Sequence, residues 1–168
     1  MPGGWSSLID PIQLADKGAR LSGALPLKGM RRLAELCLDD TGSVTIDLQF
    51  ERSHGLRMMH GTIDARVRLT CQRCMESFES DLKTRPRLLL LRHGERDELL
   101  GAGDVLVVEK PVAISAIVED ELLLVMPMVP IHPAENCPAT PPTDRSDEKE
   151  QTRPHPFSVL DRLKRTDR

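Results

Sequence analysis

The amino-acid sequence predicts an α+β fold in which two helices pack on an antiparallel sheet. Apolar and polar residues alternate through 44–50 and again through 63–71, which is the pattern of half-buried strands. The connection between these segments, around Ser53-His54-Gly55, is too short to join parallel strands, so antiparallel pairing follows. Apolar residues change to helical spacing in 28–38 and in 112–125. The pattern leaves an open sheet and a barrel-like sheet as alternatives.

The first predicted helix, 28–38, carries four side chains on one face: Met30, Leu33, Ala34 and Cys37. This stripe predicts that Cys37 is a buried thiol of the core rather than a metal ligand. Residues 1–26 are expected to be extended and rich in turns, because Pro2, Pro11 and Pro26 interrupt them.

The second predicted helix begins near Pro111 and ends before Pro127, which cannot continue a helix. Its expected apolar face consists of Ile114, Ile117, Val118, Glu121, Leu124 and Val125. Shorter runs of the same alternating or apolar kind predict further strands at 78–82, 88–92 and 105–109.

The chain of 168 residues has room for one domain and tails. We expect a single α+β domain over 1–137. An acidic disordered linker is expected over 138–153, because this stretch is rich in Pro, Asp, Glu, Lys and Thr. Phe157 and Leu160 then mark a short C-terminal helix, 154–168, as a segment that docks on a partner.

The composition excludes several classes of function. Aromatic residues make up only 2% of the chain, which argues against binding of single-stranded nucleic acid by base stacking. No secretory signal and no apolar run of membrane-spanning length is recognisable, so a cytoplasmic protein without a membrane partner is expected. No phosphate-binding loop, dinucleotide fingerprint, nucleophile elbow or zinc-protease motif is present. We therefore predict no enzyme, no small-molecule substrate and no catalytic residues.

The most specific local motif is Cys71-Gln72-Arg73-Cys74, between two predicted strands. A turn of this kind places two sulfurs at the separation that a tetrahedral metal requires. His132 and Cys137, in one proline-bounded loop, are the best candidates to complete a structural zinc site. The alternative is that Cys71 is a buried thiol and that the other cysteines are incidental. A redox pair is disfavoured, because thioredoxin-like pairs lie at a helix N-terminus.

Charge is unevenly distributed along the chain, with a net charge of +5 over 52–92 and of −9 over 93–150. The candidate nucleic-acid surface lies in the basic part and consists of Arg66, Arg68, Arg73, Lys83 and Arg85. Arg66 and Arg68 are two residues apart and share a strand face, where they could hold RNA phosphates without reading sequence. The commoner interpretation of such a set is a solvated sheet face.

The second helix carries the acidic cluster Glu119-Asp120-Glu121. Neighbouring residues of a helix point in different directions, so these carboxylates do not converge for acid–base catalysis. A solvated acidic face is expected. The alternative is that Glu119 and Glu121 bind a basic protein.

These motifs together resemble those of the YceD family, the large ribosomal RNA subunit accumulation proteins. The resemblance rests on the Cys-x-x-Cys turn, on Val118-Glu119-Asp120-Glu121-Leu122-Leu123-Leu124, and on Met126-Pro127-Met128-Val129-Pro130 followed by His132 and Cys137. The segment 153–160 is similar to the Pro-x-Pro-Phe-x-x-Leu ending of that family. Order and spacing match over most of residues 20–165.

The resemblance implies a role in the synthesis, processing or stability of large-subunit (23S-type) ribosomal RNA, and it implies no reaction. The expected function is a non-enzymatic ribosome-biogenesis factor. Its expected partner is a large-subunit rRNA precursor or a large-subunit ribosomal protein. One alternative is a zinc-knuckle protein adaptor without direct RNA contact. The other is an RNA-processing enzyme, which no motif favours.

Overall fold

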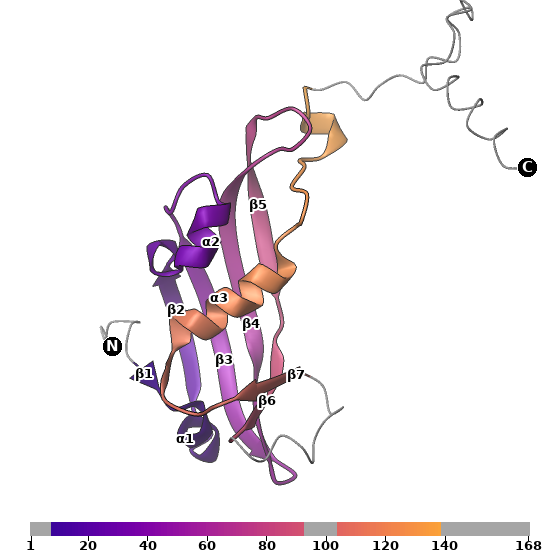
Figure 1. Ribbon diagram of the computed structural model, residues 1–168. Helices are drawn as coiled ribbons and strands as arrows, with labels where there is room; N and C mark the ends of the chain where they lie inside the picture. Colours follow the sequence, from indigo (N-terminus) through magenta and orange to yellow (C-terminus); the bar gives the residue numbers. More distant parts are fainter. Residues whose placement is uncertain (1–7, 93–103, 139–168) are drawn as a thin grey trace, which may run out of the picture. The chain divides into compact units, whose positions relative to one another are not determined.

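The computed structural model describes residues 8–92 and 104–138 (Figure 1). Its helices are α1 (Pro11–Asp16), α2 (Arg31–Leu36) and α3 (Ile114–Val125), with two 3-10 turns, η1 (Leu27–Gly29) and η2 (Ala134–Asn136). Its strands are β1 (Leu8–Ile9), β2 (Arg20–Pro26), β3 (Ser43–Ser53), β4 (Leu56–Thr70), β5 (Ser77–Thr84), β6 (Arg87–Leu91), β7 (Asp104–Val107) and β8 (Val112–Ala113). None of these helices is long and apolar enough to cross a membrane.

The main sheet has six strands, of which five follow the order β2-β3-β4-β6-β7 while β5 pairs with β4. Its pairings are antiparallel except that of β6 with β7, which is parallel. The predicted α+β class is thus confirmed. The barrel-like alternative is wrong, because the outermost strands of this order, β2 and β7, are not paired with each other in the described residues. Strands β1 and β8 form a separate two-stranded sheet.

Strand β4 has partners along both of its edges. One edge pairs with β3, and the other pairs with β6 as far as His60 and with β5 from Ile63 onward. Both of the latter pairings keep the same register, so β5 and β6 follow β4 as one strand that is interrupted at Arg85-Pro86. Proline has no N–H to donate to a strand ladder, which accounts for an interruption at this point.

One face of the main sheet is buried beneath the helices. The inward residues alternate along two neighbouring strands: Val44, Ile46, Leu48 and Phe50 on β3, and Ile63, Ala65, Val67 and Leu69 on β4. Helix α3 crosses this face (Figure 1) and adds Ile114, Ile117, Val118 and Leu122 to the same core. Each of these side chains other than Ala65 contributes roughly 1.5–3 kcal/mol when it leaves water. The opposite face of β4 carries the polar residues and is exposed.

The first 26 residues were predicted to be extended, but residues 11–16 form α1. Pro11 occupies the first turn, where its missing N–H is no loss. The Asp10 carboxylate accepts hydrogen bonds from the N–H groups of Ile12 (3.0 Å) and Gln13 (3.2 Å) and so begins the helix. Pro26 lies at the end of strand β2, at the sheet edge, where proline is tolerated.

The helix predicted over 28–38 is shorter than expected. It consists of η1 and α2, and Cys37 lies just after α2 in an extended conformation. The Cys37 thiol is therefore half-buried against the core rather than inside it. Burial still raises the pKa of this thiol.

Glu119 of α3 was expected to be solvated, and this expectation is wrong, since the residue is only 7% exposed. Its Oε1 accepts hydrogen bonds from the backbone N–H groups of Arg32 (2.7 Å) and Leu33 (3.1 Å), and its Oε2 accepts from the Arg32 guanidinium. Those N–H groups belong to the first turn of α2, whose N-cap residue, Met30, offers no side-chain acceptor. Glu119 thus caps α2 from a neighbouring helix.

The linker and the C-terminal helix predicted for 138–153 and 154–168, including Phe157 and Leu160, fall almost entirely outside the described residues. The division of the chain at residue 137 therefore stays a prediction.

Gly61 of β4 is a glycine at which substitution is predicted to be costly. Its φ is 154°, and a Cβ there would collide with the carbonyl oxygen of Asp47 on β3. Gly61→Ala should lower the free energy of unfolding by roughly 1–3 kcal/mol, measured by urea denaturation. Gly29→Ala is the control, because no atom lies within 4 Å of a Cβ there. Equal losses in the two variants would contradict this account of β4.

Removal of the Glu119 carboxylate should destabilise the protein. Glu119→Ala leaves two N–H groups of α2 without an acceptor, so the free energy of unfolding should fall by about 1–3 kcal/mol. Asp120→Ala is the matched control, because Asp120 pairs with the same Arg32 but its side chain is 59% exposed. Its loss should stay under about 1 kcal/mol. Similar midpoints for the two variants in thermal or urea unfolding would argue against a capping role.

Candidate metal centre

The turn between β4 and β5 carries the first two candidate ligands, Cys71 and Cys74. It is closed by a hydrogen bond from the Cys71 N–H to the Glu76 carbonyl and by another from the Met75 N–H to the Cys71 carbonyl, both at 2.8 Å. Met75 has a φ of 64°, an unusual value for a residue with a side chain. This tight turn folds the chain back within a few residues, so both cysteines belong to one short loop.

The second pair of candidate ligands, His132 and Cys137, lies beyond α3. Pro130 of this segment accepts a 2.8 Å hydrogen bond from the Gln72 N–H, which ties the segment to the β4–β5 turn. The turn η2 then places His132 and Cys137 on the two sides of a short loop. The two halves of the site are therefore brought together by backbone contacts as well as by their side chains.

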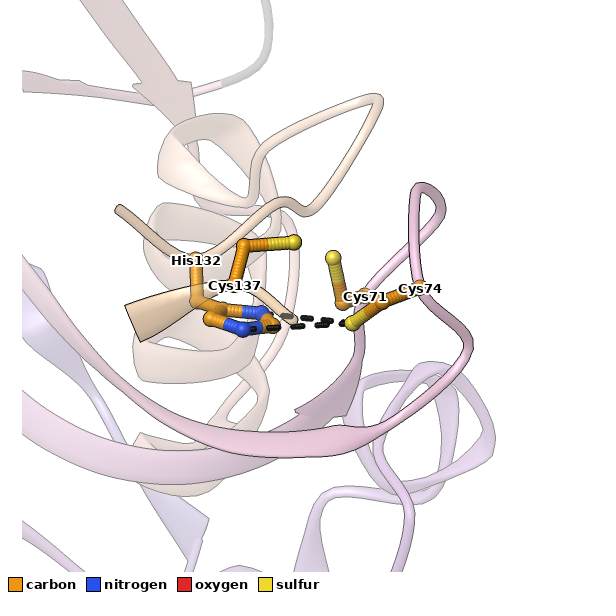
Figure 2. A group of neighbouring side chains, drawn as sticks. All are labelled: Cys71, Cys74, His132 and Cys137. Atoms are coloured by element: carbon orange, nitrogen blue, oxygen red, sulfur yellow. Dashed lines mark hydrogen bonds between the residues drawn. The ribbon is translucent and has the colours of Figure 1, made fainter. Parts of the chain in front are cut away.

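The four side chains point toward one another (Figure 2). Their ligand atoms all lie within 4.8 Å of one another, and Cys71 and His132 are buried. A tetrahedral ion with metal–sulfur bonds of about 2.3 Å needs ligand separations of roughly 3.8 Å. The distances between the ligand atoms would have to shorten by about 1 Å at most to complete this coordination shell. Three cysteines and one histidine therefore fit a metal ion in both number and chemistry.

His132 is oriented by a second interaction. Its Nε2 lies 2.7 Å from the carbonyl oxygen of Asn136, which can only accept. Nε2 therefore donates, and Nδ1 keeps the lone pair that a metal would use. A metal-binding histidine is usually held by a hydrogen bond from its other ring nitrogen, here Nε2, to a carbonyl oxygen or a similar acceptor. The ring of Phe78 packs against that of His132 at a centroid distance of 5.3 Å.

The electrostatics of the site favour thiolate at Cys71. Burial alone would raise the pKa of Cys71, but backbone N–H groups of Cys74, His132 and Arg73 act on its sulfur and bring the pKa to about 6. Burial, followed by the neighbouring thiols of Cys71 and Cys137, raises the pKa of Cys74. Because the thiolate is the form that binds metal, Cys71 is prepared for ligation.

Arg73 belongs to this centre more than to the exposed basic surface. Its Nε donates a 2.9 Å hydrogen bond to the Cys137 sulfur, and its terminal nitrogen donates to the His132 carbonyl at 3.2 Å. Through these two hydrogen bonds Arg73 ties the β4–β5 turn to the loop that carries His132 and Cys137. From the sequence, Arg73 was grouped with the phosphate-binding candidates. Its partners Cys137 and His132 are far away in the chain, so the sequence does not show these contacts.

The other members of the predicted nucleic-acid surface are exposed, but two of them have partners. Arg66 pairs with Asp81 at 2.8 Å, and Arg68 pairs with Asp39 at 2.9 Å. The Arg66 guanidinium in turn holds the pKa of the Asp81 carboxyl below its ordinary value. Lys83 and Arg85 are exposed on β5 and just after it. RNA contact by this set stays a prediction.

The predicted partner-binding acids have different surroundings. Both Glu119 oxygens already accept hydrogen bonds within the protein. Glu121 is half-buried, and burial, followed by the charges of Asp104 and Asp120, raises the pKa of its carboxyl. A partner that binds this part of α3 would therefore meet Glu121 and Asp120 more readily than Glu119.

An apolar surface strip that the sequence did not predict runs from the end of α3 to the metal centre. It consists of Leu124, Met128, Val129 and Ile131, of which Leu124 is 79% and Met128 99% exposed. Leu124 was predicted to lie on the core face of its helix. Apolar residues occur on several sides of α3, so the periodicity could not identify the buried face.

The family described as "Large ribosomal RNA subunit accumulation protein YceD" matches residues 59–164, a range that contains all four candidate ligands. The chain belongs to the YceD family. This confirms the resemblance seen in the motifs. A Haemophilus influenzae protein named "Large ribosomal RNA subunit accumulation protein YceD" is 27% identical, and the match covers 93% of this chain and 94% of that one. No solved structure gives a significant match.

Metal binding by the four ligands can be tested directly. Titration of the purified reduced chain with Co²⁺ should show about one bound ion and absorption from cobalt–thiolate bonds, as expected for a tetrahedral thiolate-rich site. Cys74→Ser and Cys137→Ser should lose most of this binding. Cys37→Ser is the matched control, because Cys37 lies outside the cluster. Full binding by Cys74→Ser, or an equal loss in Cys37→Ser, would contradict the assignment.

Proposed function

We propose that this protein is a non-enzymatic factor that supports the accumulation of large-subunit ribosomal RNA. The observation that carries the proposal is the family match over residues 59–164, supported by a similar protein of that name over nearly the whole chain. The direct partner would be a large-subunit rRNA precursor or a large-subunit ribosomal protein. The role would lie in the synthesis, processing or stability of the RNA and in the assembly of the subunit.

We further propose that the ion at the candidate metal centre is one structural zinc. Three cysteines and one histidine are a common donor set for structural zinc, and four protein ligands leave no open position for a substrate. The ion would fasten the β4–β5 turn to the segment that follows α3. Its contribution would be to hold these two parts of the surface in place, and no catalytic residue is assigned.

The protein is proposed to act in the cytoplasm. Its four cysteines are free thiols in the structure. Unpaired cysteines arranged around a metal position suit a reducing compartment, where ribosomes are assembled and disulfides are rare.

A protein adaptor without RNA contact is the second candidate function, and the apolar surface strip favours it. Exposed apolar groups such as Met128 and Val129 are typical of protein interfaces rather than of phosphate-binding surfaces. This alternative predicts a protein partner whose binding is insensitive to salt. Leu124→Ser and Met128→Ser should then weaken binding of that partner without unfolding the protein.

The role in RNA accumulation predicts a selective phenotype. Cells depleted of this protein should show a lower ratio of large to small ribosomal RNA and fewer large-subunit particles on a sucrose gradient. Wild-type protein and Cys37→Ser should restore both, whereas Cys74→Ser should restore them poorly if the metal centre is required. A normal ratio and normal particles after depletion, in rich medium and under stress, would refute the role in RNA accumulation and leave the adaptor.

A further inference from the structure

A groove lies on the protein surface where β5 and β6 are interrupted. A hollow of about 540 Å³ is bordered there by His60, Thr62, Arg85 and Arg87, among others. A second hollow of about 630 Å³ shares Arg87 and Met58 with the first. Because the two hollows share these residues, they lie side by side on the surface. We call the two together the sheet-break groove.

The fold places two arginines in this groove. Arg85 and Arg87 flank the buried Pro86, and both are exposed. Residues two apart in an extended chain point to the same side, so the two guanidinium groups share one face. The register of β4 with β6 places His60 directly opposite Arg87, at the separation of cross-strand neighbours.

These two arginines differ from several other arginines of the sheet. Arg66 and Arg68 each pair with a carboxylate, and Arg20 pairs with Asp47. No ion pair or side-chain hydrogen bond is found for Arg85 or Arg87 among the described residues. Their guanidinium donors are therefore available to an external anion.

Among the described residues, two acidic ones border the groove, one in each hollow. Glu51 lines the first, where one of its oxygens lies 3.9 Å from Nδ1 of His60, and Asp104 lines the second. Neither forms an ion pair with Arg87, although Arg87 borders both hollows. The guanidinium of Arg87 is therefore not engaged by either of these carboxylates.

We propose that the sheet-break groove binds the phosphate backbone of RNA, with Arg85 and Arg87 contacting phosphates. This inference rests on the proposed role in RNA accumulation and names the residues that would serve it. Guanidinium groups match phosphate oxygens in geometry and charge. Two linked hollows suit a polymer better than a single small anion. No Phe or Trp of the described part of the chain lines either hollow, so the groove would recognise the backbone and not stack on bases.

The test compares RNA binding by the full chain and by Arg85→Ala/Arg87→Ala. Binding of a fluorescein-labelled RNA duplex of mixed sequence is followed by fluorescence anisotropy over a range of salt concentrations. The double variant should bind about tenfold more weakly at low salt. The slope of log affinity against log salt should become shallower by roughly 1.8, since each lost phosphate contact contributes about 0.9.

The matched control is Arg20→Ala/Lys28→Ala, which removes the same charge from exposed positions on and next to β2. Its affinity should change by less than about threefold, because general attraction alone is reduced. Arg85→Lys/Arg87→Lys should keep most of the binding. Unchanged thermal unfolding of each variant shows that the fold is retained, as expected for exposed side chains.

Three results would overturn the groove assignment. These are an equal loss in the two alanine pairs, no loss in Arg85→Ala/Arg87→Ala, and no binding of the duplex by the wild-type chain. None of these touches the proposed function, which is tested by the ratio of ribosomal RNAs in depleted cells. Wild-type RNA affinity of Arg85→Ala/Arg87→Ala, in a variant that restores that ratio, refutes the groove alone. A normal ratio in cells depleted of the protein refutes the function.

Discussion

Strand β4 is the element on which the rest of the fold depends. It pairs with β3 along one edge and with β5 and β6 along the other, and its inward residues form the centre of the core. Its close approach to β3 requires glycine at position 61, where any side chain would meet the Asp47 carbonyl. Because one continuous strand carries all of these contacts, the two surfaces with candidate functions are fixed relative to each other.

These two surfaces lie at different points along β4. The Cys71 turn follows directly after its last residue, Thr70, while the sheet-break groove lies beside its first half, near His60. A metal ion at the Cys71 turn would hold the loop that follows α3 in place. The groove would not change, because it is formed by the sheet. Loss of the metal and loss of the arginines should therefore have separable effects on stability and on RNA affinity.

Helix α3 links the core to the metal centre. Its buried side carries Val118 and Leu122 against the sheet, and Glu119 reaches from the same helix to the first turn of α2. The charge of Glu119 is tolerated at low exposure because two backbone N–H groups and the Arg32 guanidinium surround it. The helix ends at Val125, and the chain then passes through the apolar strip to His132.

The sequence by itself determined the local features of the protein. Period-two alternation predicted β3, β4 and β5, and helical spacing followed by Pro127 predicted α3, because these patterns follow from the geometry of one segment. The Cys71 and Cys74 pair could also be identified, since a short turn sets its spacing. Pro11, at the start of α1, was misinterpreted as an interruption of an extended segment. Its role depends on whether Asp10, the residue before it, caps a helix that begins there.

The tertiary structure alone decided which distant groups meet. It placed Glu119 on α2, 87 positions away in the chain, and Arg73 on the Cys137 sulfur, 64 positions away. It paired Arg66 and Arg68 with carboxylates, left Arg85 and Arg87 without an ion pair among the described residues, and excluded closure of the sheet into a barrel. These outcomes depend on strand register and on the packing of α3 across the sheet, and no periodicity within a single segment records either of them.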